Sequence, residues 1–225
     1  MSAMSTDGQI RQPGSAESAS PDKGEAELAF WRGRHEAEGV LRHGHYERFY
    51  TTQFELTRND YTGKRVLDVG CGPRGSLEWA DTALERVGVD PLVGRYRELG
   101  IDQHQTTYVE AGAEAIPFPD GHFDIAASFN ALDHVDDTDA AIAELTRVTR
   151  AGGIGLIIVE VNHKPTPTEP QSLEWEILDR FTEWEVVMER RTGIDARHDV
   201  YGSWQRREPS DPGQPGIVGA RLRRR

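Results

Sequence analysis

The chain has 225 residues, of which 36% are hydrophobic, and a formal net charge of −12. This length suits one main domain, and the negative charge excludes a dedicated nucleic-acid binder, which must neutralise phosphates. The single cysteine, Cys71, excludes a framework of internal disulfides and favours a reducing compartment, so we expect a cytoplasmic protein. No apolar run approaches the roughly 20 residues that span a bilayer, so we expect no membrane partner.

Both ends of the chain are polar. Residues 1–24 and 207–225 are predicted to be a disordered segment and a flexible tail, because they have too few apolar side chains to offset their ordering entropy. Residues 25–60 are predicted to form a helical cap. An aromatic stripe at helical spacing, Tyr46, Phe49, Tyr50 and Phe54, either packs on a core or closes a pocket, and the pattern leaves both open.

The centre of the chain begins with a buried strand that runs into a glycine turn. Val66–Val69 carry one carboxylate, Asp68, and are followed by Gly70-Cys71-Gly72, where a ligand can approach the backbone closely. A second strand over residues 87–89 ends in Asp90. A strand, a glycine turn, a crossover and a second strand ending in an acid form the layout that binds a ribose-bearing cofactor.

Further elements alternate along the rest of the chain, which predicts a parallel sheet with helices on both faces. We expect strands over residues 107–110, 123–128, 154–161, 186–189 and 200–204. Helices are expected from Ser76 toward Leu84, over residues 96–100, after the caps Asp136 and Asp137, and over residues 172–181.

Four segments in this order resemble the motifs of class I S-adenosylmethionine-dependent methyltransferases. They are residues 66–73, 87–90, 113–124 and 127–135. The resemblance covers about residues 60–162 and implies a Rossmann-like sandwich: a mostly parallel seven-stranded sheet, helices on both faces and an N-terminal helical cap, with an antiparallel last strand. It implies a methyltransferase domain over residues 25–206, with the cap at 25–60, a cofactor-binding core at 61–162 and a substrate-side part at 163–206.

The resemblance also implies which residues bind S-adenosylmethionine. They are Tyr46, Tyr50, Asp68, Gly70, Cys71, Gly72, Asp90, Pro91, Leu92, Ala113, Glu114, Asn130 and Ala131. Asp90 is expected to accept the ribose hydroxyls, and Asp68 to contact the amino-acid end. Two departures from the family pattern are Gly112, where relatives carry an aspartate for the adenine, and Arg74 in the glycine turn.

Polar side chains follow the fourth and fifth expected strands, where parallel sheets bind their ligands. His134 and His163 are the candidate bases for an acceptor's proton, and a structural role for His134 stays open. Asp133, Glu160 and Asn162 are expected to contact the substrate. The sequence contains no recognised metal-ligand spacing, so we expect no metal. Asp133, His134 and His163 could form a metal site only if the fold brought them together.

These residues predict an S-adenosylmethionine-dependent methyltransferase of a small molecule, acting by O- or N-methylation in secondary metabolism and leaving S-adenosylhomocysteine. The expected partner is a small-molecule acceptor, with no nucleic acid, and the protein is expected to be a monomer or homodimer. Two alternatives remain: a catalytically inactive S-adenosylmethionine-binding scaffold or sensor, and an NAD(P)-dependent reductase.

Overall fold

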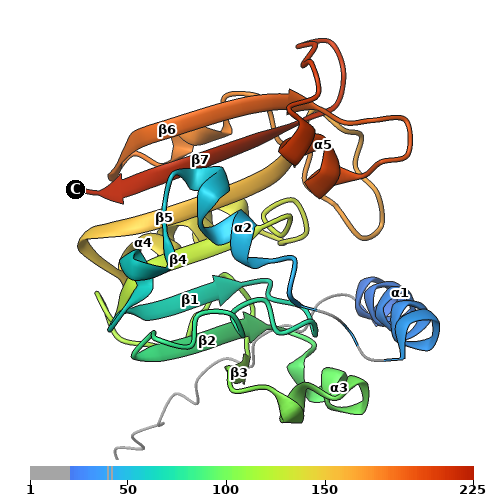
Figure 1. Ribbon diagram of the computed structural model, residues 1–225. Helices are drawn as coiled ribbons and strands as arrows, with labels where there is room; N and C mark the ends of the chain where they lie inside the picture. The colour runs from blue at the N-terminus through green and yellow to red at the C-terminus, as the bar shows by residue number, and fades with distance from the viewer. Residues whose placement is uncertain (1–20, 40, 42) are drawn as a thin grey trace, which may run out of the picture.

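The computed structural model describes residues 21–39, 41 and 43–225 (Figure 1). Its centre is a seven-stranded sheet in the order β3-β2-β1-β4-β5-β7-β6. The strands are β1 (Arg65–Val69), β2 (Glu85–Asp90), β3 (Thr107–Glu110), β4 (Phe123–Phe129), β5 (Thr149–Val161), β6 (Trp184–Gly193) and β7 (Gly216–Arg224). The α-helices are α1 (Pro21–Glu38), α2 (Glu47–Tyr50), α3 (Val93–Tyr96), α4 (Thr138–Val148) and α5 (Val200–Arg206).

Short 3₁₀ turns complete the fold: η1 (Thr52–Phe54), η2 (Arg58–Tyr61), η3 (Arg97–Leu99), η4 (Ile101–Gln103) and η5 (Ile177–Arg180). The pairs β1–β2, β1–β4, β2–β3 and β4–β5 are parallel, whereas β7 runs antiparallel to both β5 and β6. The expected mostly parallel sheet with an antiparallel last strand is therefore confirmed. Strand order reverses at β1 and β4, so their carboxyl ends open a crevice suited to ligands.

Each face of the sheet carries its own apolar core. On one face α4 and the chain around η5 pack against the strands, with Leu145, Val148 and Phe181 fully buried. On the other face α2, η1 and α5 supply Phe49, Phe54 and Trp204, which close over the sheet. Because both faces of the sheet are covered, the central strands are mainly apolar, with the buried acids Asp68 and Glu160 as exceptions.

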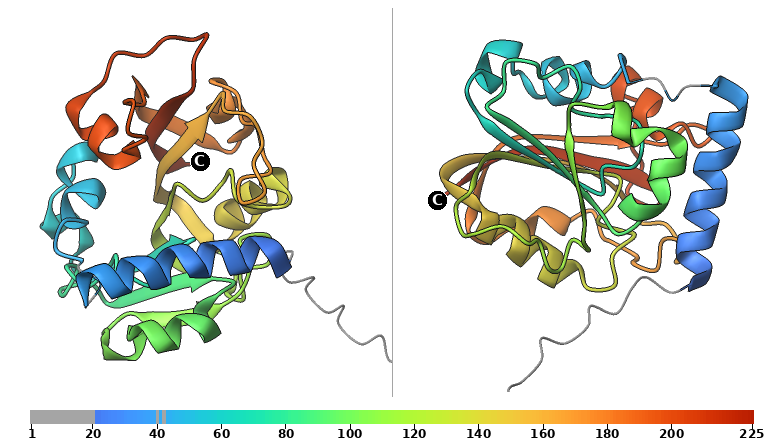
Figure 2. Two further views of the ribbon diagram at one scale, coloured as in Figure 1. Left: turned by 90° about the vertical axis from the view of Figure 1, so that its right-hand side faces the viewer. Right: turned by 90° about the horizontal axis from the view of Figure 1, so that it is seen from below.

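The long helix α1 lies across the carboxyl ends of the strands rather than on either face (Figure 2). Its Leu28 packs with Val93, Tyr96 and Ile101 in a third small core. The salt bridges Arg32–Glu98 and Arg95–Glu25 join the helix to the α3–η3 region. The predicted cap therefore has two parts: α1 over the strand ends, and the aromatic stripe of residues 46–54 on one sheet face.

Three predicted elements are wrong. Residues 76–84 form successive turns because Leu77 and Trp79, two positions apart, are buried in the same core, which a helix does not allow. Residues 172–181 do not form an α-helix: a turn at residues 175–176 leads into the 3₁₀ turn Ile177–Arg180. Residues 200–204 belong to α5, because the side chain of Asp199 accepts a hydrogen bond from the backbone N–H of Gly202 and caps a helix there.

The predicted flexible tail of residues 207–225 is also wrong, because residues 216–224 form β7 inside the sheet. Val218, Ala220 and Leu222 alternate toward one core and are buried. The predicted disordered segment 1–24 lies outside the described residues up to position 20, and residues 21–24 begin α1. Among the helices that the structure describes, none is long and apolar enough to cross a membrane.

Candidate functional site

The glycine turn after β1 lies at the crevice in the sheet. Gly70 and Gly72 have φ values of 73° and 56°, a region that side chains with a Cβ rarely adopt. The N–H of Gly70 donates to the carbonyl of Val89 at 2.8 Å, which ties the turn to the end of β2. A Cβ on Gly70 would lie 2.3 Å from the Cβ of Ala131, so the turn and the chain after β4 approach each other as only glycine permits.

Asp68 is buried below this turn. Its Oδ2 accepts hydrogen bonds from the hydroxyl of Tyr50 at 2.8 Å and from the hydroxyl of Ser76. Burial raises the pKa of Asp68 to about 6, while these two hydrogen bonds act in the opposite direction. The side chain thus joins the cap, the first strand and the chain after the turn in one buried polar contact.

Asp90 ends β2 beside the same turn. Its Oδ2 accepts the backbone N–H of Gly72 at 3.1 Å, and its Oδ1 accepts that of Leu92 at 2.9 Å. Burial raises the pKa of Asp90 to about 6, and the negative charge of Glu27 on α1 acts in the same direction. The hydroxyl of Tyr96 also hydrogen-bonds to Asp90, so three of the roughly four acceptor positions of the carboxylate are occupied within the chain and one can still accept a hydroxyl of a ligand.

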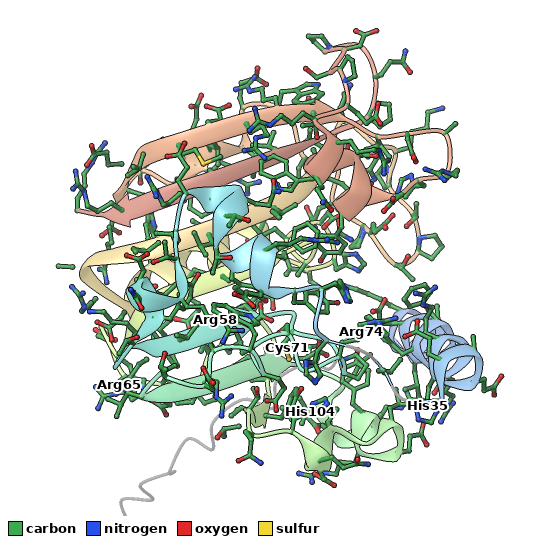
Figure 3. All side chains as sticks on the ribbon, viewed as in Figure 1. His35, Arg58, Arg65, Cys71, Arg74 and His104 are labelled. Atoms are coloured by element: carbon green, nitrogen blue, oxygen red, sulfur yellow. The ribbon has the colours of Figure 1, made fainter. Side chains whose placement is uncertain are left out.

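Helix α1 closes the turn from outside. A Cβ on Gly72 would lie 3.1 Å from the ring of Trp31, and the Nε1 of Trp31 donates to Glu27 at 2.7 Å. The guanidinium of Arg74 lies 5.6 Å from the Trp31 ring centroid and pairs with Glu38 at 2.6 Å. Figure 3 shows Arg74 between the Cys71 turn and α1. Arg74 therefore binds the turn to the helix.

The other predicted cofactor residues surround this turn. Cys71 and Ala113 are buried, and Tyr46, whose pKa burial raises to about 12, lies in the cap close to Asp68, Cys71 and Arg74. The Oδ1 of Asn130 is buried, and it has no hydrogen-bond partner among the residues that the structure describes. Pro91 follows Asp90 directly and is exposed. Glu114 instead accepts the backbone N–H of Asp136 at 2.9 Å, which orders the loop before α4.

The predicted acceptor-side residues also meet. Asp133 is fully buried, and its Oδ2 lies 3.6 Å from the Nε2 of His163, a distance longer than a hydrogen bond. His134 Nε2 lies 3.9 Å from an oxygen of Glu169, a residue that the sequence did not single out. Asp133 chiefly raises the pKa of His163, to about 9. These four side chains are named the acceptor-side cluster below.

Two further predicted residues flank the cluster at the end of β5. Glu160 pairs with His198 at 3.0 Å, and burial, together with the charges of Asp133 and Glu169, raises its pKa. The side-chain amide of Asn162 donates to the carbonyls of Pro212 and Gln214, at 3.2 and 3.0 Å. Asn162 thus holds the loop before β7, whereas Glu160 faces the cluster.

Sequence reasoning missed Trp31, Ser76 and Glu169. A buried acid such as Asp68 requires partners, and a serine eight positions later was a signal for Ser76. The spacing Thr166-x-x-Glu169 was a signal for Glu169, because threonine and glutamate three apart commonly bond each other's backbone. Trp31 carried no signal beyond its place in an expected helix.

A separate cavity of about 630 Å³ lies between the end of α1 and η3–η4. Its lining includes His35, Leu99 and His104 and none of the predicted site residues. We therefore take the buried acids and the glycine turn, and not this cavity, as the candidate functional site.

The sequence and the fold both match known methyltransferases. Residues 67–157 match the methyltransferase domain family. The chain is 38% identical over 91 residues to the malonyl-[acyl-carrier protein] O-methyltransferase of Enterobacter lignolyticus, covering 40% of this chain and 36% of that protein. It is 43% identical over 89 residues to the ubiquinone/menaquinone biosynthesis C-methyltransferase UbiE of Shewanella piezotolerans, covering 39% and 34%. The chain thus spans about a third of the length of these relatives.

A solved structure extends the likeness to the fold. An S-adenosylmethionine-dependent methyltransferase from Thermotoga maritima superposes with a TM-score of 0.58 at 16% identity, covering 88% of this chain and 98% of that one. The four motifs fall within or beside the segment that the family model matches: three lie at the carboxyl ends of β1, β2 and β4, and the third, residues 113–124, joins β3 to β4. Residues 67–157 therefore match the methyltransferase domain family, and the fold as a whole is like that of S-adenosylmethionine-dependent methyltransferases.

Proposed function

We propose that this chain transfers a methyl group from S-adenosylmethionine to a hydroxyl or amine of a small molecule. The observation that carries the proposal is the pair of buried acids, Asp68 and Asp90, on either side of the glycine turn within the family segment. Two neighbouring strand ends thereby offer hydrogen-bond acceptors to the two ends of one extended ligand. The acceptor-side cluster follows β4, next to the Ala131 that touches Gly70.

The residues present fit this cofactor. The glycines leave the backbone of the turn open to close approach, and the Oδ1 of Asn130 is a buried acceptor that a ligand can satisfy. Asp90 is placed to accept ribose hydroxyls, as the family pattern implies. Gly112 offers no side chain to the adenine, so that base has to be recognised by backbone atoms or by its neighbours.

When bound, S-adenosylmethionine supplies a methyl group that its sulfonium charge makes electrophilic. The chain's part is to align the acceptor atom with that methyl at about 3 Å and to exclude water, which can contribute several kcal/mol. Helix α1 excludes water by covering the turn with Trp31. His163 holds a proton at neutral pH because Asp133 raises its pKa to about 9, so of the two candidate bases His134 is the one placed to receive the acceptor's proton.

The nature of the attacking atom is part of the proposal. The names of the two relatives above include one O-methyltransferase and one C-methyltransferase. Proton-accepting side chains gather where the acceptor would lie, and a hydroxyl or amine must lose a proton, so we favour O- or N-methylation. Secondary metabolism remains the proposed setting.

Binding and turnover experiments test the proposal. Calorimetric titration should show S-adenosylhomocysteine binding, and NADH should not raise the melting temperature, because only a ligand of the native state does so. Incubation with radiolabelled S-adenosylmethionine and a metabolite extract should then give a labelled small molecule. Tight cofactor binding without any labelled product would favour the inactive scaffold, and a response to NADH alone would favour the reductase.

A further inference from the structure

The acceptor-side cluster holds buried polar atoms without partners. Within the described part of the chain, these atoms are Oδ1 and Oδ2 of Asp133, Nε2 of His134 and Nε2 of His163. The side chain of Asp133 is 0% exposed. The imidazole of His163 lies 3.6 Å away, too far for a hydrogen bond, and a buried carboxylate without hydrogen bonds is costly, so its retention at a fold's ligand-binding edge points to a cationic ligand.

The same atoms are close enough to share one ion. Ligand atoms of Asp133, His134 and Glu169 all lie within 4.8 Å of one another. An ion with bonds of about 2.0–2.2 Å holds its donors about 3–4 Å apart, so binding requires side-chain shifts of only about 1 Å. The three donors come from the chain after β4 and from the loop after β5, which meet only in the folded protein.

Hydrogen bonds already orient these side chains. The hydroxyl of Thr166 donates to Oε2 of Glu169 at 3.1 Å and leaves Oε1 facing His134. The Nδ1 of His163 donates to the carbonyl of Lys164 at 3.0 Å, so that its Nε2 faces Asp133. Metal ligands are commonly held by such outer contacts, which fix the orientation of each donor.

We propose that Asp133, His134 and Glu169 bind a divalent transition-metal ion, with His163 and Thr166 as positioning residues. One imidazole and two carboxylates form a donor set that suits Mn²⁺, Fe²⁺ or Zn²⁺ better than Mg²⁺. Three protein ligands leave coordination positions open, as in catalytic rather than structural metal sites. The proposal differs from the expectation, drawn from ligand spacing alone, that the chain holds no metal site.

The open positions are suited to a methyl acceptor. Asp133 lies two residues after Ala131, which touches the glycine turn, so the site is on the acceptor side of the crevice. An ion there would lower the pKa of an acceptor hydroxyl and let its proton pass to solvent, with His134 as a ligand instead of a base. This step rests on the proposed function, and it points to acceptors that present an oxygen to the ion.

Zn²⁺ and Mn²⁺ titrations of the full-length, chelator-treated protein test the site directly. We expect one Zn²⁺ per chain, and at least 100-fold weaker binding in Asp133→Asn and Glu169→Gln, since even outer contacts contribute about 10–100-fold. Glu169→Gln keeps the proposal testable if the buried Asp133→Asn variant fails to fold. His122→Gln is the matched control, because His122 pairs with Glu85 at 2.8 Å and is not part of the cluster.

The outcomes separate this proposal from the proposed function. Wild-type affinity in both cluster variants, Mg²⁺ binding as tightly as Zn²⁺, or no saturable binding would overturn the metal site. Binding of S-adenosylhomocysteine by the same samples reports on the fold and on the cofactor site independently. Metal binding without cofactor binding would support the ion site and contradict the methyltransferase activity. Cofactor binding without metal binding would support the cofactor site and contradict the ion site.

Discussion

The hydroxyl of Tyr50 donates a 2.8 Å hydrogen bond to Oδ2 of Asp68, which links the cap to the first strand inside the core. Tyr50→Phe should destabilise the protein by about 1.5–3 kcal/mol at pH 7, because a charged acceptor loses one of its donors. Urea unfolding measures this. The matched control is Tyr201→Phe, since the hydroxyl of Tyr201 makes only a 3.5 Å contact with the carbonyl of Phe129. Equal losses in the two variants would contradict the role of the Tyr50 contact.

Stability should fall as pH rises through the range where the strand-end acids ionise. The pKa of Asp90 is raised to about 6 in the folded chain, against about 3.9 when unfolded. Between these values the native state holds a proton that the unfolded state has lost, so stability decreases with rising pH and levels off above about 6. Asp90→Asn should reduce the stability difference between pH 4.5 and 7 by roughly 2 kcal/mol in urea unfolding. An unchanged difference would show that Asp90 does not titrate in this way.

Asp90 should also determine cofactor affinity. Asp90→Ala is expected to weaken S-adenosylhomocysteine binding by about 1.5–3 kcal/mol, or roughly 10- to 150-fold, because a charge-assisted contact to the ribose is lost. Calorimetry measures the affinity. Asp102→Ala, at an exposed aspartate that pairs with Arg97, serves as the control and should bind normally. Wild-type affinity in Asp90→Ala would remove the ribose assignment.

The hydrogen bond from Thr166 to Glu169 leads to a prediction that separates a positioning role of the Thr166 hydroxyl from a purely structural role of this residue. Thr166→Val removes the hydroxyl that donates to Glu169 and should weaken Zn²⁺ binding about 10- to 100-fold. Thr166→Ser keeps the hydroxyl and should restore near-normal binding. If serine fails to rescue the affinity, the hydroxyl is not what orients Glu169.

The last strand should tolerate no side chain where it meets α5. A Cβ on Gly219 would lie 2.2 Å from the ring of Trp204, which is fully buried. Gly219→Ala should therefore destabilise the protein by about 1–3 kcal/mol through overpacking. Gly213→Ala, where the nearest atom to a Cβ is an oxygen of Asp211 at 3.4 Å, should be nearly neutral. Thermal unfolding of both variants checks the contrast.

The parallel half of the sheet was predictable because its strands are buried on both faces and are continuous apolar runs, as residues 156–159 show. The last strand was not recognised, because arginines interrupt its sequence and its composition is that of a tail. Its alternation of Val218, Ala220 and Leu222 was the available signal. Arg221 lies on the opposite face, where it donates to the carbonyl of Phe54.

The candidate site, like the sheet, was predictable from the sequence only in part. Asp68 and Asp90 were identifiable because each ends or interrupts a buried strand, where a carboxylate is costly unless it is hydrogen-bonded. Asp133, His134 and His163 could be named from their places after strands, but their convergence depends on a loop whose turn only the structure shows. Glu169 was missed because it becomes a neighbour of His134 only through that turn.

The packing of Trp31 on Gly72 has a kinetic consequence. A helix that rests on the turn and is anchored there by the Arg74–Glu38 pair stands in the path by which a nucleoside would arrive and depart. On the proposed function, each catalytic cycle includes a displacement of α1 from the turn, and release of the product nucleoside can be slower than methyl transfer.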